Sequence, residues 1–120
     1  MGLDMYAYTT SETPEKPVDF TVTEASQFFY WRKHPDLHGW MEELYQEKGG
    51  TEQFNCVPVQ ITAEDLDRLE ADIRSGDLPD TTGFFFGNSD GSETEDDLAF
   101  ITAAREALAE GHTVYYDSWW

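Results

Sequence analysis

Hydrophobic and polar residues alternate at both ends of this chain, which is the pattern of half-buried β-strands. Near the start, Leu3, Met5 and Ala7 fall on one side of an extended backbone, with Asp4 and two tyrosines on the other. Near the end, residues 112–120 (HTVYYDSWW) are rich in Val, Tyr and Trp, which favour strands. The pattern predicts one strand at residues 2–9 and another at the end of the chain.

The central stretch, residues 28–45 (FFYWRKHPDLHGWMEELY), has apolar residues at helical spacing and is divided by Pro35. Proline is favoured in the first turn of a helix and disrupts a helix interior. We therefore expect one helix to end near His34 and a second to begin at Pro35. Four residues form the apolar side of the second helix: Leu37, Trp40, Met41 and Leu44. On this side the ring of Trp40 should be largely buried.

The next two elements carry clear local signals. Residues 54–61 (FNCVPVQI) have strand composition, but Pro58 cannot donate to a ladder, so this strand should be short, bulged or at an edge. Thr62 then predicts the start of a helix, with Asp65 supporting a variant capping box and Gly76 ending the helix. Its buried side should consist of Leu66, Leu69 and Ile73.

Two further elements complete the expected fold. Residues 83–87 (GFFFG) are an apolar run bounded by glycines and predict a central strand buried on both faces. Thr94 should cap the last helix, whose inward residues should be Leu98, Ile101, Ala104 and Leu108. The element order is then β-α-α-β-α-β-α-β. This order predicts an α+β fold in one globular domain over residues 1–120, with three to four helices on one face of a small mixed four-stranded sheet.

Charge is the most extreme feature of the composition. There are 25 acidic residues against seven basic ones, so the net charge at pH 7 is −18. Direct binding of nucleic acid is not expected, because phosphate contacts need a basic surface. We expect instead a basic partner protein, held by carboxylates of the helices that begin at Thr62 and Thr94. The expected partner-binding residues are Glu64, Asp65, Asp67, Asp72, Asp90, Glu93, Glu95 and Asp96. Acidity that serves solubility alone is the competing interpretation.

The cysteine content and the apolar runs indicate a cytoplasmic protein. A single cysteine, Cys56, excludes an intramolecular disulfide and fits a reducing compartment. Asp4 interrupts the only early apolar run, so no secretory signal is expected. The longest apolar runs are far shorter than a membrane span, so no membrane contact is expected.

A second hypothesis is a small-ligand binding protein or enzyme that uses an aromatic and basic corner at residues 31–40, with an anion or a nucleotide as ligand. Arg32 and Lys33 precede the start of a helix, where free amide groups and the helix dipole favour an anion. Aromatic walls with a few polar groups are typical of a ligand pocket. The expected ligand-binding residues are Tyr6, Trp31, Arg32, Lys33, His34, His38, Tyr116 and Trp119. The competing interpretation is that this segment is simply the core.

Metal binding and catalysis are weakly indicated. His34 and His38 stand four residues apart, a spacing that can bind metal on one helix face, but Pro35 lies between them. Cys56 and Ser118 have no recognisable catalytic partner in the sequence. We therefore expect no metal, no cofactor and no catalytic residues, and a binding protein rather than an enzyme.

Four blocks of the sequence resemble a group of known proteins: the opening MGLDMY, the segment YWRKHPDLHGW at residues 30–40, the GFFFG run and the closing YYDSWW. Together they are similar to an uncharacterised family of small proteins from phages and bacterial genomes. The resemblance implies a phage or mobile-element origin and residence in a host cytoplasm. The resemblance implies origin and fold more than activity. In a phage setting, the strong acidity of this chain leads us to expect a small acidic inhibitor that occupies a basic, nucleic-acid-binding surface of a host or defence protein.

Overall fold

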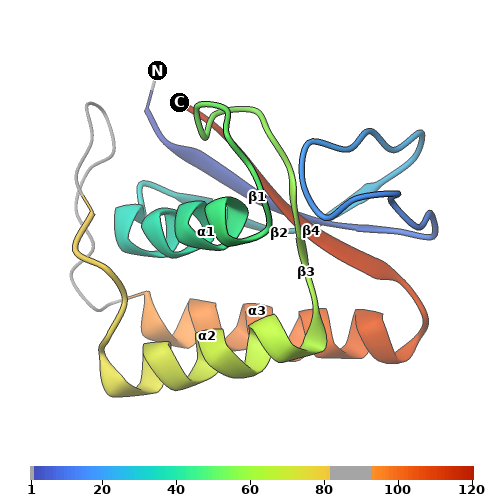
Figure 1. Ribbon diagram of the computed structural model, residues 1–120. Helices are drawn as coiled ribbons and strands as arrows, with labels where there is room; N and C mark the ends of the chain where they lie inside the picture. The colour runs from blue at the N-terminus through green and yellow to red at the C-terminus, as the bar shows by residue number, and fades with distance from the viewer. Residues whose placement is uncertain (1, 82–92) are drawn as a thin grey trace.

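The computed structural model describes residues 2–81 and 93–120, which form four strands and three helices (Figure 1). In chain order these are β1 (Asp4–Thr10), β2 (Ser26–Arg32), α1 (Pro35–Glu47), β3 (Val59–Ile61), α2 (Ala63–Ser75), α3 (Thr94–Ala109) and β4 (Thr113–Trp119). The fold is α+β, as the sequence predicts. The predicted GFFFG strand lies outside the described residues.

The four strands form one sheet in the order β2-β1-β4-β3. Each neighbouring pair is antiparallel, so the sheet of the described residues is antiparallel rather than mixed as predicted. The strands from the two ends of the chain, β1 and β4, lie side by side at its centre. The strand β3 has only three residues and lies beyond β4, with Val18 bridged to Val59. The strand predicted at residues 54–61 is therefore confirmed as short and at an edge, but it covers only Val59–Ile61.

The predicted helix before Pro35 is wrong, because this segment is the strand β2. Its apolar spacing fits a helix and a strand equally well, and pairing with β1 decides between them. In this pairing Trp31 lies opposite Met5 and is buried, whereas the neighbouring Arg32 is exposed. The strand ends where Lys33 takes a positive φ of 55°. The observed order is thus β-β-α-β-α-α-β.

The signals for the helices α1 and α2 are confirmed. The helix α1 begins at Pro35, and α2 begins after Thr62, whose side chain and that of Asp65 form the predicted capping box. Gly76 ends α2 in the left-handed conformation, with a φ of 74°. The helix α3 differs slightly, because Thr94 is its first residue and does not stand at the cap position, which Glu93 occupies.

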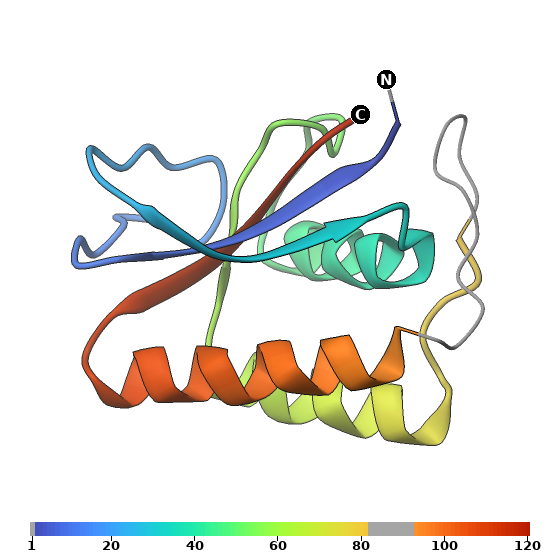
Figure 2. The same ribbon diagram turned by 180° about the vertical axis from the view of Figure 1, so that it is seen from behind.

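The helices cover one face of the sheet and leave the other without a helix. In Figure 2 no helix lies in front of β1, β2 and β4. The core between the sheet and the helices includes Met5, Ala7, Trp31, Leu37, Trp40, Met41, Leu44, Leu66, Leu69, Ile73, Phe100, Ile101, Ala104, Val114 and Tyr116. Leu98 and Leu108 are only half-buried and pack against this core. None of the helices in the described part of the chain has the length and apolar character of a membrane span.

Candidate functional site

The sheet face without helices carries an unusual set of side chains, which we call the open face. Alternate residues of a strand point to the same side, and the register brings eight such residues from three strands together. They are Asp4, Tyr6, Tyr8, Tyr30, Arg32, Tyr115, Asp117 and Trp119. Tyr6 stands at the centre, opposite Tyr30 on one neighbouring strand and Asp117 on the other.

The tyrosines of the open face form a continuous row of rings across the sheet. The ring centroids of Tyr30 and Tyr6 are 5.5 Å apart, and those of Tyr6 and Tyr8 are 6.1 Å apart. Tyr8 stacks on Tyr115 at 5.1 Å, and the edge of Phe20, from the loop between β1 and β2, closes the row at 5.2 Å. These contacts fix the rings before any partner arrives, which lowers the entropy cost of binding.

The open face also holds the large apolar side chains that are most exposed in the described part of the chain. Tyr30 is 45% exposed and Trp119 is 65% exposed. Tyr and Trp at the surface are typical of protein interfaces, because they offer a large contact area with few rotatable bonds. Two such residues on one uncovered face indicate a binding surface.

One end of the row carries an ion pair. Arg32 Nη1 donates to Asp4 Oδ1 at 2.9 Å, and the Tyr30 hydroxyl donates to the same oxygen at 2.6 Å. The hydrogen bond to Asp4 raises the pKa of the Tyr30 hydroxyl. Sequence reasoning placed Arg32 in an anion site, but its guanidinium is held by a carboxylate of the protein itself.

The middle of the row is acidic. Burial raises the pKa of Asp117, whose Oδ1 accepts a hydrogen bond of 2.7 Å from the amide of Ser118. Burial also raises the pKa of Tyr8, and it raises that of Tyr115 to about 12, with the nearby Asp117 charge adding to both shifts. The hydroxyls therefore stay protonated at neutral pH, and the surface around Asp117 favours a cation.

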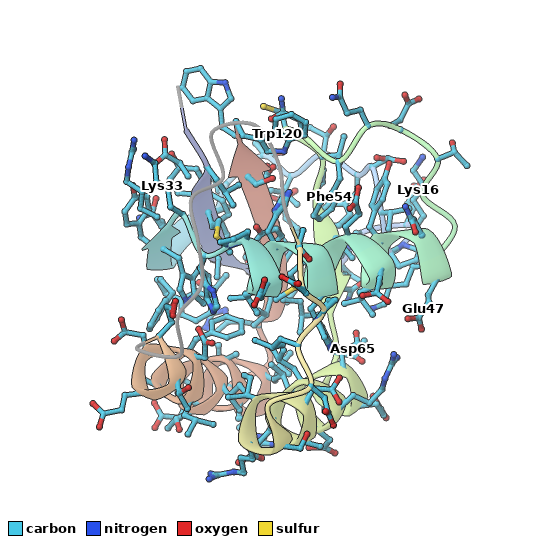
Figure 3. All side chains as sticks on the ribbon, turned by 90° about the vertical axis from the view of Figure 1, so that its left-hand side faces the viewer. Lys16, Lys33, Glu47, Phe54, Asp65 and Trp120 are labelled. Atoms are coloured by element: carbon cyan, nitrogen blue, oxygen red, sulfur yellow. The ribbon has the colours of Figure 1, made fainter. Side chains whose placement is uncertain are left out.

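The structure divides the eight residues expected to bind a small ligand between two faces. Tyr6, Arg32 and Trp119 lie on the open face. Four others are buried between the sheet and the helices: Trp31, His34, His38 and Tyr116. Lys33 is exposed, and Figure 3 shows it on the opposite side of the molecule from Lys16. The eight residues therefore lie in two separate places, some exposed and some buried, rather than in one corner.

The buried group is organised around Asp97, which sequence reasoning did not identify. Asp97 Oδ1 accepts a hydrogen bond from the Trp31 indole at 3.1 Å, and Asp97 Oδ2 lies 2.9 Å from His34 Nε2. A cavity of about 140 Å³ adjoins this group. It is lined by His34, Asp36, Ile73, Gly76, Leu78, Glu93, Thr94 and Asp97. Typical ligand pockets have roughly 300–1,000 Å³, and this acidic lining does not favour an anion.

His38 occupies a separate buried position. Its Nδ1 lies 2.7 Å from the Tyr116 hydroxyl, and its ring packs on Phe54 with centroids 4.9 Å apart. Burial lowers the pKa of His38 from 6.5 to about 4, so the ring is neutral at physiological pH. In the described residues no group of three or more His, Cys, Asp or Glu is arranged to hold a metal ion.

His38 should make the free energy of unfolding depend on pH. Between pH 6.5 and about 4 the unfolded chain binds the proton and the folded chain does not, so the stabilising contribution falls as pH decreases through this window. The loss should reach about 3 kcal/mol near pH 4. NMR titration of the His38 ring carbons measures the pKa in the folded protein, from which this loss follows. A ring that titrates between pH 6 and 7 would contradict the buried environment described above.

Several acids expected to bind a partner have roles inside the fold. Asp65 is 6% exposed, pairs with Lys48 and caps α2. Asp72 Oδ2 accepts a hydrogen bond from the Trp40 indole at 2.8 Å. Both carboxylates are therefore occupied by structural contacts rather than presented to a partner.

The remaining expected acids are placed differently from one another. Asp67 pairs with Arg105 at 2.8 Å, and Glu93 has little exposed area and lies near His34. Three are exposed on the helices: Glu64, Glu95 and Asp96. Asp90 lies outside the described residues. The helical surface therefore offers fewer available carboxylates than the sequence suggests.

No protein-family model matches the chain, and neither does any curated protein or solved structure. The resemblance to small phage and bacterial proteins stays a prediction. The open face and the buried Asp97 group are thus the features from which function is inferred.

Proposed function

We propose that this chain is a non-enzymatic binding protein whose partner is a basic protein, and that the open face is the surface through which it binds. The observation that carries the proposal is the combination of exposed aromatic side chains with carboxylates on the one sheet face that no helix covers. The net charge of −18 would draw a basic protein toward the molecule and speed their encounter.

The distribution of basic residues supports a basic partner. Among the described residues, five of the seven Lys and Arg side chains already form ion pairs with carboxylates of the chain itself. They are Arg32, Lys48, Arg68, Arg74 and Arg105. Seven basic residues cannot neutralise 25 acidic ones, so the remaining negative charge attracts cations from outside the molecule.

A protein of this charge would compete with nucleic acid for a cationic surface, because its carboxylates take the place of phosphates. This is the form of inhibition expected from the acidity of the chain in a phage setting. Binding of an anion or nucleotide, the alternative expected from the sequence, has less support, because the cavity beside Asp97 is small and acidic.

The proposal is tested by affinity capture with the immobilised protein under three conditions: low salt, high salt and added nucleic acid. A basic protein should be retained from cell lysate at low salt, released at high salt, and displaced by added nucleic acid. Replacing the two exposed rings (Tyr30→Ser with Trp119→Ser) should abolish capture. The control (Glu95→Gln with Asp96→Asn), which removes two charges from α3, should retain most of it.

Two results would overturn the proposal. One is the absence of any basic protein in the low-salt eluate. The other is the reverse pattern of variants, in which the α3 changes abolish capture and the open-face changes do not, since the helical acids would then be the interface.

A further inference from the structure

The carboxylate of Asp117 differs from the other carboxylate of the open face. Asp4 is already paired with Arg32, whereas Asp117 accepts a hydrogen bond from a backbone amide. In the described part of the chain no Lys or Arg side chain forms an ion pair with Asp117. A half-buried carboxylate without a cationic neighbour is stabilised when a cation binds to it.

The chain shows on the same face how a guanidinium is held. At one end of the tyrosine row, Arg32 donates to Asp4 beside the ring of Tyr30, whose hydroxyl shares the same oxygen. At the middle of the row, Asp117 stands directly opposite Tyr6, and its charge acts on Tyr8 and Tyr115. The surroundings of Asp117 therefore resemble those of Asp4 in having a carboxylate beside tyrosine rings. They differ in that no arginine of the described residues pairs with the carboxylate.

We propose that the open face binds one arginine side chain of the partner, with the guanidinium on the Asp117 carboxylate and against the rings of Tyr6 and Tyr8. This inference rests on the proposed function and adds to it the residue type that is recognised. Arginine fits better than lysine, because its planar guanidinium stacks on aromatic rings and donates two parallel hydrogen bonds to one carboxylate.

The charge of the molecule selects this occupant over two others. A second copy of the chain would bring another net charge of −18 against the same face, and nucleic acid would bring phosphates. Both would be repelled at low salt, whereas an arginine-bearing segment would be attracted most strongly there.

The test uses two nine-residue peptides of equal charge, one of arginines and one of lysines, titrated into the protein at low salt. The wild-type protein should bind the arginine peptide several-fold more tightly than the lysine peptide. Asp117→Asn keeps the shape and an acceptor for Ser118, and should weaken arginine binding by about tenfold, as for the loss of a charged pair at an interface. Asp96→Asn removes the same charge from exposed α3 and should change binding less than twofold.

A second readout does not depend on any variant. With ¹³C-labelled side chains, the carboxyl signal of Asp117 in the wild-type protein should shift when the arginine peptide is added and much less with the lysine peptide.

Equal binding of both peptides, with Asp117→Asn no different from Asp96→Asn, would overturn this inference and leave the proposed function standing. Failure of both peptides to bind would overturn both. A Trp119 signal that shifts with protein concentration alone would identify a second copy as the occupant and would also overturn the inference.

Discussion

Trp40→Ala should lower the free energy of unfolding by about 3–5 kcal/mol, because it removes a large buried ring and leaves a cavity. The ring is 6% exposed, its indole N–H donates to Asp72, and the guanidinium of Arg68 lies 5.9 Å from its centroid. A domain of this size has roughly 5–15 kcal/mol of stability, so the melting temperature should fall markedly. Chemical denaturation of the variant and the wild type measures the difference.

The controls for this prediction lie on the same helix. Glu42→Gln and Glu47→Gln change side chains that are half-buried and exposed, respectively, and each should cost less than about 0.5 kcal/mol. Glu47 pairs with Arg68, but this pair is exposed and contributes little. Equal losses from all three substitutions would mean that the buried side of α1 has been assigned wrongly.

Asp97→Ala should also be severely destabilising, by about 3–5 kcal/mol, because it removes the carboxylate that two buried side chains share. The carboxylate is 2% exposed, and its oxygens bind the Trp31 indole and the His34 ring. Asp97→Asn is the matched control: it keeps one oxygen as an acceptor for the indole and should cost less than half as much. Urea unfolding followed by tryptophan fluorescence checks both values. A loss below about 1 kcal/mol for Asp97→Ala would show that these buried contacts do not hold α3 against the sheet.

The parts of the fold that depend on local signals could be predicted from the sequence. Pro35, the Thr62 capping box and Gly76 each fix a helix end within a few residues, and the structure confirms them. The strand β2 could not be predicted in this way, since Trp31 suits a helix or a strand until β1 pairs with it. That pairing places Trp31 opposite Met5, which lies 26 positions earlier in the chain, and no local pattern contains such a contact.

The candidate site could be identified only once the register of the sheet was known. Tyr6, Arg32 and Trp119 were identified from the sequence, but they were grouped with Trp31 and Tyr116, which face the core. Tyr30, Tyr115 and Asp117 were missed because their neighbours across the strands were unknown. Val114, Tyr115 and Tyr116 are all buried, so burial does not separate the two faces of β4, and only its register with β1 does. Asp97 carries no sign of burial in the sequence, because an acid in the first turn of a helix is ordinarily exposed, and only the fold shows that it is buried.

The tryptophans provide the most direct measurement of the central claim, that the open face is the binding surface. Trp119 lies on that face, Trp31 is in the core, and Trp40 lines the groove between α1 and α2. Each indole N–H gives its own NMR signal, so titration of the ¹⁵N-labelled protein with an arginine-rich peptide at low salt reports on all three places at once. We expect the Trp119 signal to shift strongly while the Trp31 and Trp40 signals stay in place. A strong shift of Trp40 with no change in Trp119 would place the interface on the helices and contradict the proposed binding surface.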